Sequence, residues 1–183
     1  LSLVEAIESS RKDSDIYTPY HKMLKAGIRI IPCGYPDYPA KLSHIPSPPM
    51  YLFVAGALPD PAVPSIAIVG TREMTGYGRK AAEYFGGELA KAGVNIISGM
   101  ARGIDGVAGR AAFNTGGKSY AVLGCGADVC YPLQNKDLYE RLKADGGVIS
   151  PFIPGQKPLP ALFPLRNRII SGLSEALVVV EAG

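Results

Sequence analysis

Short apolar runs alternate with longer amphipathic segments from residue 65 onward. The runs are continuously apolar, as in Ile66-Ala67-Ile68-Val69, and do not alternate with polar positions. Continuous runs indicate strands that are buried on both faces, which is typical of a parallel sheet between helices. We predict strands at 66–69, 94–97, 119–123, 148–149 and 176–180, and helices at 76–92, 104–114, 135–144 and 168–173. This order predicts an α/β fold with a mainly parallel sheet and helices on both of its faces.

The first 64 residues follow a more irregular pattern. It predicts a helix over 17–26, a strand over 28–31 and, after a proline-rich stretch, a second apolar strand over 50–54. We interpret 1–64 as an N-terminal lead-in that extends the sheet, and 65–183 as the main domain. Because the chain does not begin with Met and its last strand runs into the terminus, we expect an internal part of a longer protein. The final strand is then expected to form an exposed sheet edge, prone to aggregation unless other residues cover it.

Composition narrows the class of protein. With 47% hydrophobic and 19% charged residues, the chain can bury a core, which excludes an intrinsically disordered protein. The 22 glycines and 16 prolines follow no collagen period and favour many turns over a coiled coil. No apolar run approaches the roughly 20 residues of a membrane-spanning helix, and the start lacks a signal-peptide pattern. We therefore expect a soluble, cytoplasmic protein with no membrane partner.

Charge and cysteine content limit the possible ligands. The net charge of +3 is mild, so a site for a polyanion must be local. The three cysteines form no Cys-x-x-Cys pair, and the two histidines, His21 and His44, lie far from them in sequence. We therefore predict no metal site.

In an open parallel sheet, ligands bind beyond the carboxyl ends of the strands, where loops and helix N-termini gather. After the first of these strands, residues 70–78 combine three glycines, two threonines and Arg72 directly before a helix. The segment is neither a dinucleotide fingerprint nor a Walker loop. Its backbone N–H groups, the helix dipole and the Arg72 guanidinium nevertheless predict a phosphate cradle. A simple tight turn is the alternative.

The next two loops add further candidates. Small residues at 98, 99, 101 and 103 keep side chains out of the crevice, and we interpret Asp105 as a helix cap without ligand contact. Ser98 is not expected to act as a nucleophile, because the sheet region holds no histidine to activate it. Cys125 is predicted to be a buried, unreactive thiol. Tyr131 is interpreted as a core aromatic, with base stacking as the alternative.

The segment around Asn167 carries the most informative local signal. Arg166 and Arg168 flank this asparagine just after a proline that favours a helix start. The apolar residues that follow must pack inward, so Arg166 is expected at the edge of the cleft and Arg168 beside it. The two guanidinium groups and the first-turn N–H groups would then converge on one anion. The alternative is a structural salt bridge to Glu175 or Glu181.

Together these motifs resemble the DNA-processing protein A family (DprA, also called Smf). The resemblance covers about 28–183, and its motifs occur in the same order as in the family. They include Val69-Gly70-Thr71-Arg72, Tyr77-Gly78, Ser98-Gly99-Met100-Ala101-Arg102-Gly103-Ile104-Asp105, Gly116-Gly117-Lys118, Tyr131-Pro132 and Phe163-Pro164-Leu165-Arg166-Asn167-Arg168. The lead-in Tyr35-Pro36-Asp37-Tyr38-Pro39 is similar to the stretch that precedes the domain there. The resemblance implies that the sheet is Rossmann-like.

The resemblance also implies a function. Members are non-catalytic proteins of natural transformation that bind and protect incoming single-stranded DNA, help load the RecA recombinase onto it and commonly form homodimers, without a cofactor. The DNA-binding residues that carry over are Gly70, Arg72, Ser98, Gly99, Lys118, Arg166, Asn167 and Arg168. Fixed arginines and backbone N–H donors would neutralise phosphates and release counterions, so the affinity for DNA is expected to fall with salt.

Two departures and two alternatives accompany this interpretation. Ser150-Pro151-Phe152 stands where members usually read Ser-Glu-Tyr, and the chain stops at Gly183, before the family's next Ser-Gly-rich loop. One alternative is a nucleoside-monophosphate phosphoribohydrolase of the LOG type, for which Glu181 is the candidate carboxylate. The Pro-Gly-Gly-x-Gly-Thr-x-x-Glu loop of those enzymes is absent from the sequence. The other alternative is a nucleotide-sensing protein, which would prefer a mononucleotide to an oligonucleotide.

Overall fold

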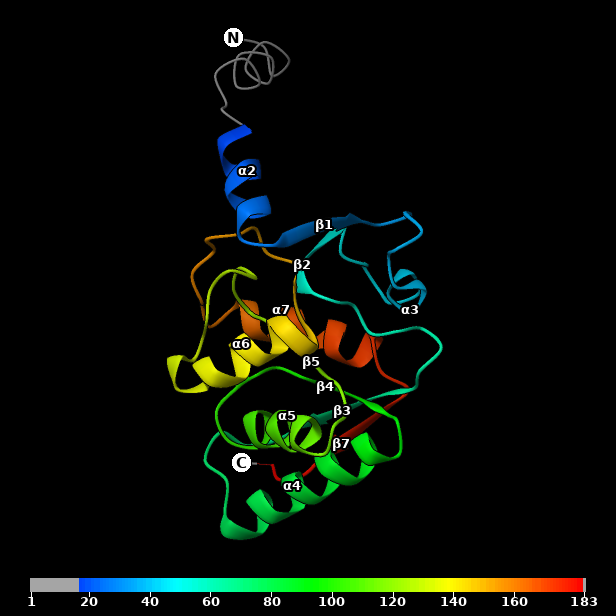
Figure 1. Ribbon diagram of the computed structural model, residues 1–183, viewed down its shortest axis with the longest axis vertical. Helices are drawn as coiled ribbons and strands as arrows, with labels where there is room; N and C mark the ends of the chain where they lie inside the picture. The colour runs from blue at the N-terminus through cyan, green and yellow to red at the C-terminus, as the bar shows by residue number, and fades with distance from the viewer. Residues whose placement is uncertain (1–16, 183) are drawn as a thin grey trace.

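A seven-stranded sheet forms the centre of the molecule, with the strand order β1-β2-β6-β5-β4-β3-β7 (Figure 1). The structure is a computed structural model that describes residues 17–182. Five neighbouring strands are parallel: β6 (Gly147–Ser150), β5 (Ser119–Val122), β4 (Asn95–Ser98), β3 (Ser65–Val69) and β7 (Ala176–Val179). The mainly parallel sheet that the continuous apolar runs predict is confirmed.

The lead-in contributes two further strands to the same sheet. β2 (Tyr51–Gly56) pairs antiparallel with β6, and β1 (Ile28–Pro32) pairs antiparallel with β2. The helix α2 (Tyr17–Lys25) precedes β1. A short helix, α3 (Ala40–Ser43), lies in the proline-rich stretch, where the sequence pattern did not predict one because four residues are too few to show a helical period.

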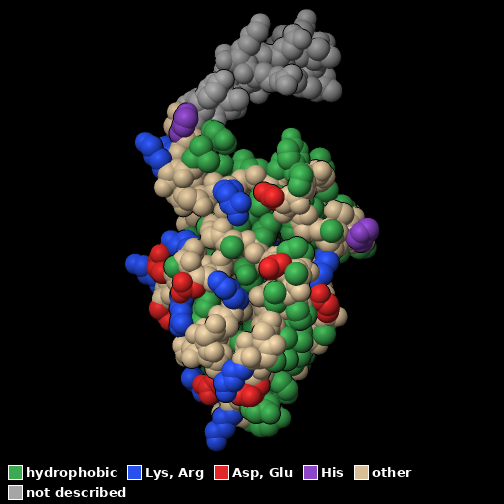
Figure 2. Space-filling model, turned by 45° about the vertical axis from the view of Figure 1, so that its right-hand side comes forward, with side chains coloured by type: hydrophobic (Ala, Val, Ile, Leu, Met, Phe, Trp, Pro, Cys, Tyr) green, Lys and Arg blue, Asp and Glu red, His purple; other side chains and the backbone are tan. Residues whose placement is uncertain are grey.

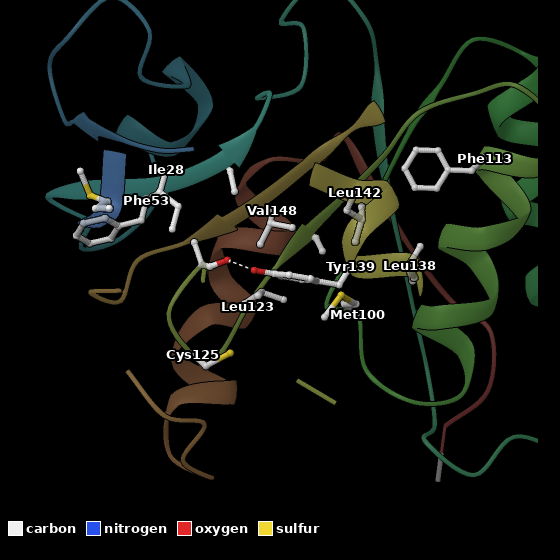
Figure 3. Close-up of a cluster of buried hydrophobic side chains, with 14 residues drawn as sticks. Ile28, Phe53, Met100, Phe113, Leu123, Cys125, Leu138, Tyr139, Leu142 and Val148 are labelled. Carbon is white, nitrogen blue, oxygen red and sulfur yellow. Dashed lines mark hydrogen bonds between the residues drawn. The ribbon is translucent and has the colours of Figure 1, made fainter. Parts of the chain in front are cut away.

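Helices cover both faces of the sheet, as predicted. One face is covered by α4 (Gly76–Lys91), α5 (Ile104–Asn114) and α6 (Lys136–Asp145), which the 3₁₀ turn η1 (Leu133–Asn135) precedes. The other face is covered by α3 and α7 (Leu162–Gly172). Figure 3 shows the core under α6, where Leu138, Tyr139 and Leu142 lie against Leu123 and Val148 of the sheet.

Small residues allow α4 to lie directly on α5. Gly78, Ala82 and Gly86 are buried on the inner side of α4. A Cβ at Gly86 would lie 2.6 Å from the backbone oxygen of Ala108 on α5. The loops that begin these two helices, 70–75 and 99–103, are therefore held close together at the carboxyl end of the sheet.

The start of α7 differs from the prediction. The helix was predicted to begin at 168, but it begins at Leu162, with Pro164 as its third residue. Proline is tolerated there because the first turn of a helix needs no backbone N–H donors. The earlier start places Arg166 on the buried stripe of α7, one turn before Ile169 and Ile170. This placement decides the role of Arg166, as described below.

Within the described residues, β7 is an edge strand, as predicted. It pairs only with β3, and its Leu177 and Val179 side chains are 50% and 56% exposed. Figure 2 shows hydrophobic side chains gathered on the lower half of the molecule, the end that holds β7 and α4 in Figure 1. No helix in residues 17–182 is long and apolar enough to cross a bilayer.

Candidate functional site

A cleft opens at the carboxyl ends of β3 and β7. The chain runs from β3 through β4 and β5 to β6 on one side, whereas β7 lies on the other side of β3. Such a reversal of strand order is where open α/β sheets bind their ligands. The cleft has a volume of about 840 Å³, and loops after β3 and β4, helix α7 and the end of β7 line it. Its charged and aromatic lining includes Arg72, Arg102, Asp105, Phe163 and Arg166.

Arg166 forms the floor of this cleft. The sequence had predicted it at the edge of the cleft instead. The side chain is only 5% exposed, because α7 begins early enough to place it on the buried stripe of the helix. Its Nη1 donates hydrogen bonds to the backbone oxygens of Gly99 (3.0 Å) and Val122, at the ends of β4 and β5. Its Nε donates to Oδ1 of Asn167 at 3.0 Å. Arg166 therefore fixes α7 to the carboxyl end of the sheet.

Gly99 leaves the space that Arg166 occupies. A Cβ at position 99 would lie 2.6 Å from Cζ of Arg166. We expect Gly99→Ala to displace the guanidinium and to lower the free energy of unfolding by about 1–3 kcal/mol, as overpacking does. Urea denaturation measures this loss. Gly76→Ala is the matched control, because no atom lies within 4 Å of its added Cβ, and a similar loss there would contradict the steric argument.

Asp105 was expected to cap α5, but it organises the preceding loop instead. The residue is buried in the first turn of α5, and its Oδ2 accepts hydrogen bonds from the backbone N–H groups of Gly99 (3.0 Å) and Ala101 (3.4 Å). Burial raises the pKa of Asp105, while the positive charge of Arg166 and the backbone N–H donors act in the opposite direction. Burial likewise lowers the pKa of Arg166, which Asp105 partly offsets. The two buried charges therefore compensate one another without a direct ion pair.

Phe163 stands between two basic side chains at the centre of the site. The guanidinium carbon of Arg72 lies 5.6 Å from the ring centroid of Phe163, and that of Arg166 lies 6.0 Å away. The ring fits against the end of β5 because Gly124 has no Cβ, which would lie 2.7 Å from the ring. Arg72 and Phe163 also line a second hollow of about 410 Å³. The two hollows share Arg72, Ala101, Arg102, Phe163 and Arg166 in their linings, and we refer to them together as the trough over Phe163.

Tyr131 lies in the second hollow and is not a core residue, contrary to the first interpretation. Its side chain is 43% exposed, and its ring centroid lies 5.8 Å from that of Phe163. It comes after the loop that leaves β5 rather than from a strand, so no sheet face covers it. The trough therefore presents two aromatic rings beside its guanidinium groups.

Two residues of this trough, Arg102 and Phe163, were not predicted individually from the sequence. Arg102 is exposed and lines both hollows. It follows β4, and its position in a strand-end loop was the available signal, but the small residues around it dominated the interpretation. Phe163 belongs to a motif that the resemblance used, yet nothing in the sequence places its ring between two arginines.

The phosphate cradle predicted at the start of α4 is filled by the chain itself. Oε2 of Glu181, which follows β7, accepts hydrogen bonds from the backbone N–H (3.0 Å) and hydroxyl (3.3 Å) of Thr75. The Thr75 hydroxyl in turn accepts from the backbone N–H of Gly78 and caps the helix. The N-terminus of α4 therefore already holds a carboxylate, whereas Arg72 and Gly70 of the same segment do line the cleft.

Arg168 is not brought into the cleft. Two residues apart on a helix do not share a face, so burial of Arg166 directs Arg168 elsewhere. Its Nη1 donates to the backbone oxygens of Pro46 (3.1 Å) and Ser47, which attaches the lead-in to α7. The predicted convergence of two arginines on one anion is therefore wrong.

The alternative prediction, a salt bridge from these arginines to Glu175 or Glu181, is also wrong, because neither carboxylate contacts them. Glu175 forms an ion pair with Lys41 and accepts a hydrogen bond from the backbone N–H of Ser65, and these two contacts lower the pKa of Glu175. Glu181 is held by Thr75. The lead-in is thus tied to the start of β7 by Lys41 and to α7 by Arg168.

The remaining candidates lie outside the trough or under it. Lys118 precedes β5, at the opposite end of the sheet, where its Nζ donates to the backbone oxygen of Asp145 at 3.2 Å. Ser98 is buried, and its hydroxyl accepts from the backbone N–H of Met100. Asn167 lines the cleft. Burial raises the pKa of the Cys125 thiol to about 11, which agrees with the predicted unreactive thiol.

Comparison with known proteins identifies relatives of the chain. The sequence model of the family described as DNA recombination-mediator protein A matches residues 29–183. Protein Smf of Synechocystis is 43% identical over 151 residues, which are 80% of this chain and 38% of that protein. DNA processing protein DprA of Streptococcus pneumoniae is 43% identical over 145 residues, 79% of this chain and 51% of that protein. The chain thus spans between about two fifths and half of these relatives.

Two solved structures share the fold. The X-ray structure of DprA from Streptococcus pneumoniae has a TM-score of 0.78 and 37% identity, over 87% of this chain and 57% of that chain. DNA processing protein A from Helicobacter pylori, whose structure is described for its single-stranded DNA binding mode, has a TM-score of 0.75 and 26% identity, over 85% and 69% of the two chains. The likeness therefore extends over most of this chain.

Proposed function

The chain belongs to the DNA recombination-mediator protein A family, and from this premise we propose that it binds single-stranded DNA in the trough over Phe163. The observation that carries the proposal is the arrangement of Arg72, Arg102 and Phe163 along both hollows at the strand-order reversal. The relative from Helicobacter pylori binds single-stranded DNA and shares this fold. We further propose that the protein takes part in DNA processing during natural transformation.

The chemistry of the trough suits a single strand. Arg72 and Arg102 are exposed, and neither forms an ion pair with any residue between 17 and 182, so both are available to phosphates. The rings of Phe163 and Tyr131 offer faces on which unpaired bases can stack, a contact that tolerates any sequence. Arg166 is held by two backbone oxygens and keeps Phe163 in place. Binding would therefore be sequence-tolerant and sensitive to salt.

Three finer points belong to the same proposal and rest on the family resemblance. We propose that the protein is not an enzyme, that it helps to load RecA onto DNA in the cytoplasm, and that the intact protein forms a homodimer. For the first point, the carboxylate that a phosphoribohydrolase would need, Glu181, is engaged by Thr75 at the start of α4. The DNA-binding unit would be 65–183, with 1–64 as the lead-in.

Titration of a labelled oligothymidylate by fluorescence anisotropy tests the proposal. We expect saturable binding whose affinity falls as salt rises, and we expect thymidine monophosphate to compete far less well than unlabelled oligothymidylate. Equal competition by the mononucleotide would favour a nucleotide-sensing protein. Release of free base from nucleoside monophosphates would instead favour the enzyme, and absence of oligonucleotide binding would remove the proposal.

A further inference from the structure

Glu181 holds both ends of the short loop that carries Arg72. Its backbone oxygen accepts a hydrogen bond from the N–H of Thr71 at 2.7 Å, and its Oε2 accepts from the N–H of Thr75 at 3.0 Å. Thr71 and Thr75 enclose residues 72–74. Glu181, two residues beyond the end of β7, therefore fixes the loop on both sides of Arg72.

Two glycines reserve the space for this contact. A Cβ at Gly70 would lie 2.9 Å from the backbone oxygen of Glu181, and a Cβ at Gly78 would overlap its carboxylate. Neither glycine has a positive φ, so a turn conformation does not explain them. Close approach of Glu181 explains Gly78. At Gly70 the backbone of Glu181 and the side chain of Ile104, whose Cγ1 would lie 2.6 Å from the added Cβ, together exclude a side chain.

The negative charge of Glu181, taken by itself, opposes the proposed binding of DNA phosphates. Glu181 lines the cleft, where it repels a phosphate and occupies the positive end of the α4 dipole. If its charge were its only effect, the cleft would bind DNA better without it. A contribution that outweighs this repulsion must come from the geometry of the loop.

We propose that Glu181 is a positioning residue for Arg72, an inference that rests on the proposed binding of DNA in this cleft. By anchoring Thr71 and Thr75, Glu181 keeps Arg72 over the Phe163 ring, where the guanidinium carbon is 5.6 Å from the centroid. A guanidinium that is already in place loses less conformational entropy when it binds a phosphate. The carboxylate thus contributes to anion binding although it carries the wrong charge.

Two substitutions test this proposal by the direction in which each changes the affinity for the labelled oligothymidylate. Glu181→Ala removes the charge and the side-chain anchor at Thr75 together, leaving only the backbone contact to Thr71, and we expect binding about fivefold weaker. Glu181→Gln removes the charge but keeps an acceptor oxygen for Thr75, and we expect affinity equal to the unmodified chain or up to about threefold tighter. Glu73 provides the control, because it lies in the same loop and cleft and its side chain forms no hydrogen bond with the described residues. We expect Glu73→Ala to tighten binding.

Three outcomes would overturn the proposal. Tighter binding by Glu181→Ala would show that Glu181 acts only as a repulsive charge, and equal weakening by Ala and Gln would show that the charge itself is needed. In an Arg72→Ala background, Glu181→Ala should no longer weaken binding, and at most it should tighten binding as the loss of the repulsive charge does in Glu181→Gln. A weakening as large as in the unmodified chain would show that Glu181 does not act through Arg72.

A measurement without DNA separates this inference from the proposed function. We expect Glu181→Ala, but not Glu181→Gln, to speed amide hydrogen exchange at Thr75, because only the alanine lacks an acceptor for that N–H. Thr71 keeps the backbone oxygen of residue 181 as its acceptor in both variants and serves as the internal control. If the unmodified chain fails to bind oligothymidylate, the proposed function fails, while unchanged exchange in Glu181→Ala sinks the anchoring role by itself. Urea denaturation of each variant shows whether its fold is retained.

Discussion

Arg166→Ala is expected to lower the free energy of unfolding by about 3 kcal/mol, the largest stability effect of any cleft substitution. The substitution leaves the backbone oxygens of Gly99 and Val122 without their buried donor. It also leaves Asp105 buried without the positive charge that offsets its burial. Urea denaturation measures the change, and Arg166→Lys, which retains the charge, should lose less. A loss below about 1 kcal/mol would contradict the role of Arg166 as the floor of the cleft.

The pH dependence of this variant identifies the cause. Burial raises the pKa of Asp105 above its ordinary value of 3.8, so the folded state binds this proton more readily than the unfolded state. The contribution of Asp105 to stability therefore falls as pH rises from about its ordinary pKa through the raised one. Arg166 lowers the pKa of Asp105. Without Arg166 this pKa rises further, and Asp105 therefore destabilises the fold over a wider range of pH that extends to higher values. We expect the deficit of Arg166→Ala to be smallest in acid and to grow toward neutral pH.

Asp105→Asn in the Arg166→Ala background completes this test. Asparagine cannot ionise, yet its side-chain oxygen still accepts from the loop N–H groups of Gly99 and Ala101. We expect the double variant to regain part of the lost stability at neutral pH and to lose the pH dependence. A double variant as unstable as Arg166→Ala at every pH would show that the lost hydrogen bonds, and not the uncompensated charge, cause the deficit.

The elements of the main domain could be predicted from the sequence because each gives a local signal. The helices are long enough to show a helical period, and the strands are continuous apolar runs. The helix 104–114 matches α5, and the strand runs match β3, β4 and β5 to within one or two residues. The predicted start of α7 at 168 was wrong because the proline at 164 was placed before the helix, although proline also fits the first turn of a helix that begins at Leu162. Both arginines were expected at the cleft, but Arg166 is buried under it and Arg168 faces the lead-in.

Contacts between distant segments limited the prediction of the site. Arg72 could be found from its strand-end loop, and Arg102 could have been found in the same way. The ring of Phe163 between two guanidinium groups depends on α7 crossing the ends of β4 and β5, which no local pattern specifies. Glu181 at the start of α4 depends on β7 pairing beside β3, so the predicted phosphate cradle was filled from a strand 100 residues or more away in sequence.

The double variant Arg72→Ala/Arg102→Ala is expected to weaken binding of oligothymidylate about a hundredfold, because each exposed guanidinium contributes a charge-assisted contact worth about tenfold. Because two guanidinium groups no longer neutralise phosphates, the slope of log affinity against log salt should become shallower by about 1.4. Anisotropy titrations at several salt concentrations measure both quantities. The fold should be unaffected, since neither side chain is buried.

Lys118→Ala and Arg168→Ala are the matched controls for that experiment. Both residues are exposed and basic, and both match the binding motifs of the family, but the structure places Lys118 at the opposite end of the sheet and Arg168 on the lead-in loop. We expect either substitution to change affinity by less than about twofold and to leave the salt slope unchanged, because charges this distant are largely screened. If Arg168→Ala weakens binding as much as Arg72→Ala does, the DNA path leaves the trough over Phe163 and follows the lead-in. The same loss in Lys118→Ala would place DNA at the opposite end of the sheet. If a single strand binds in the trough, only substitutions of residues that line it should change the affinity and the salt slope.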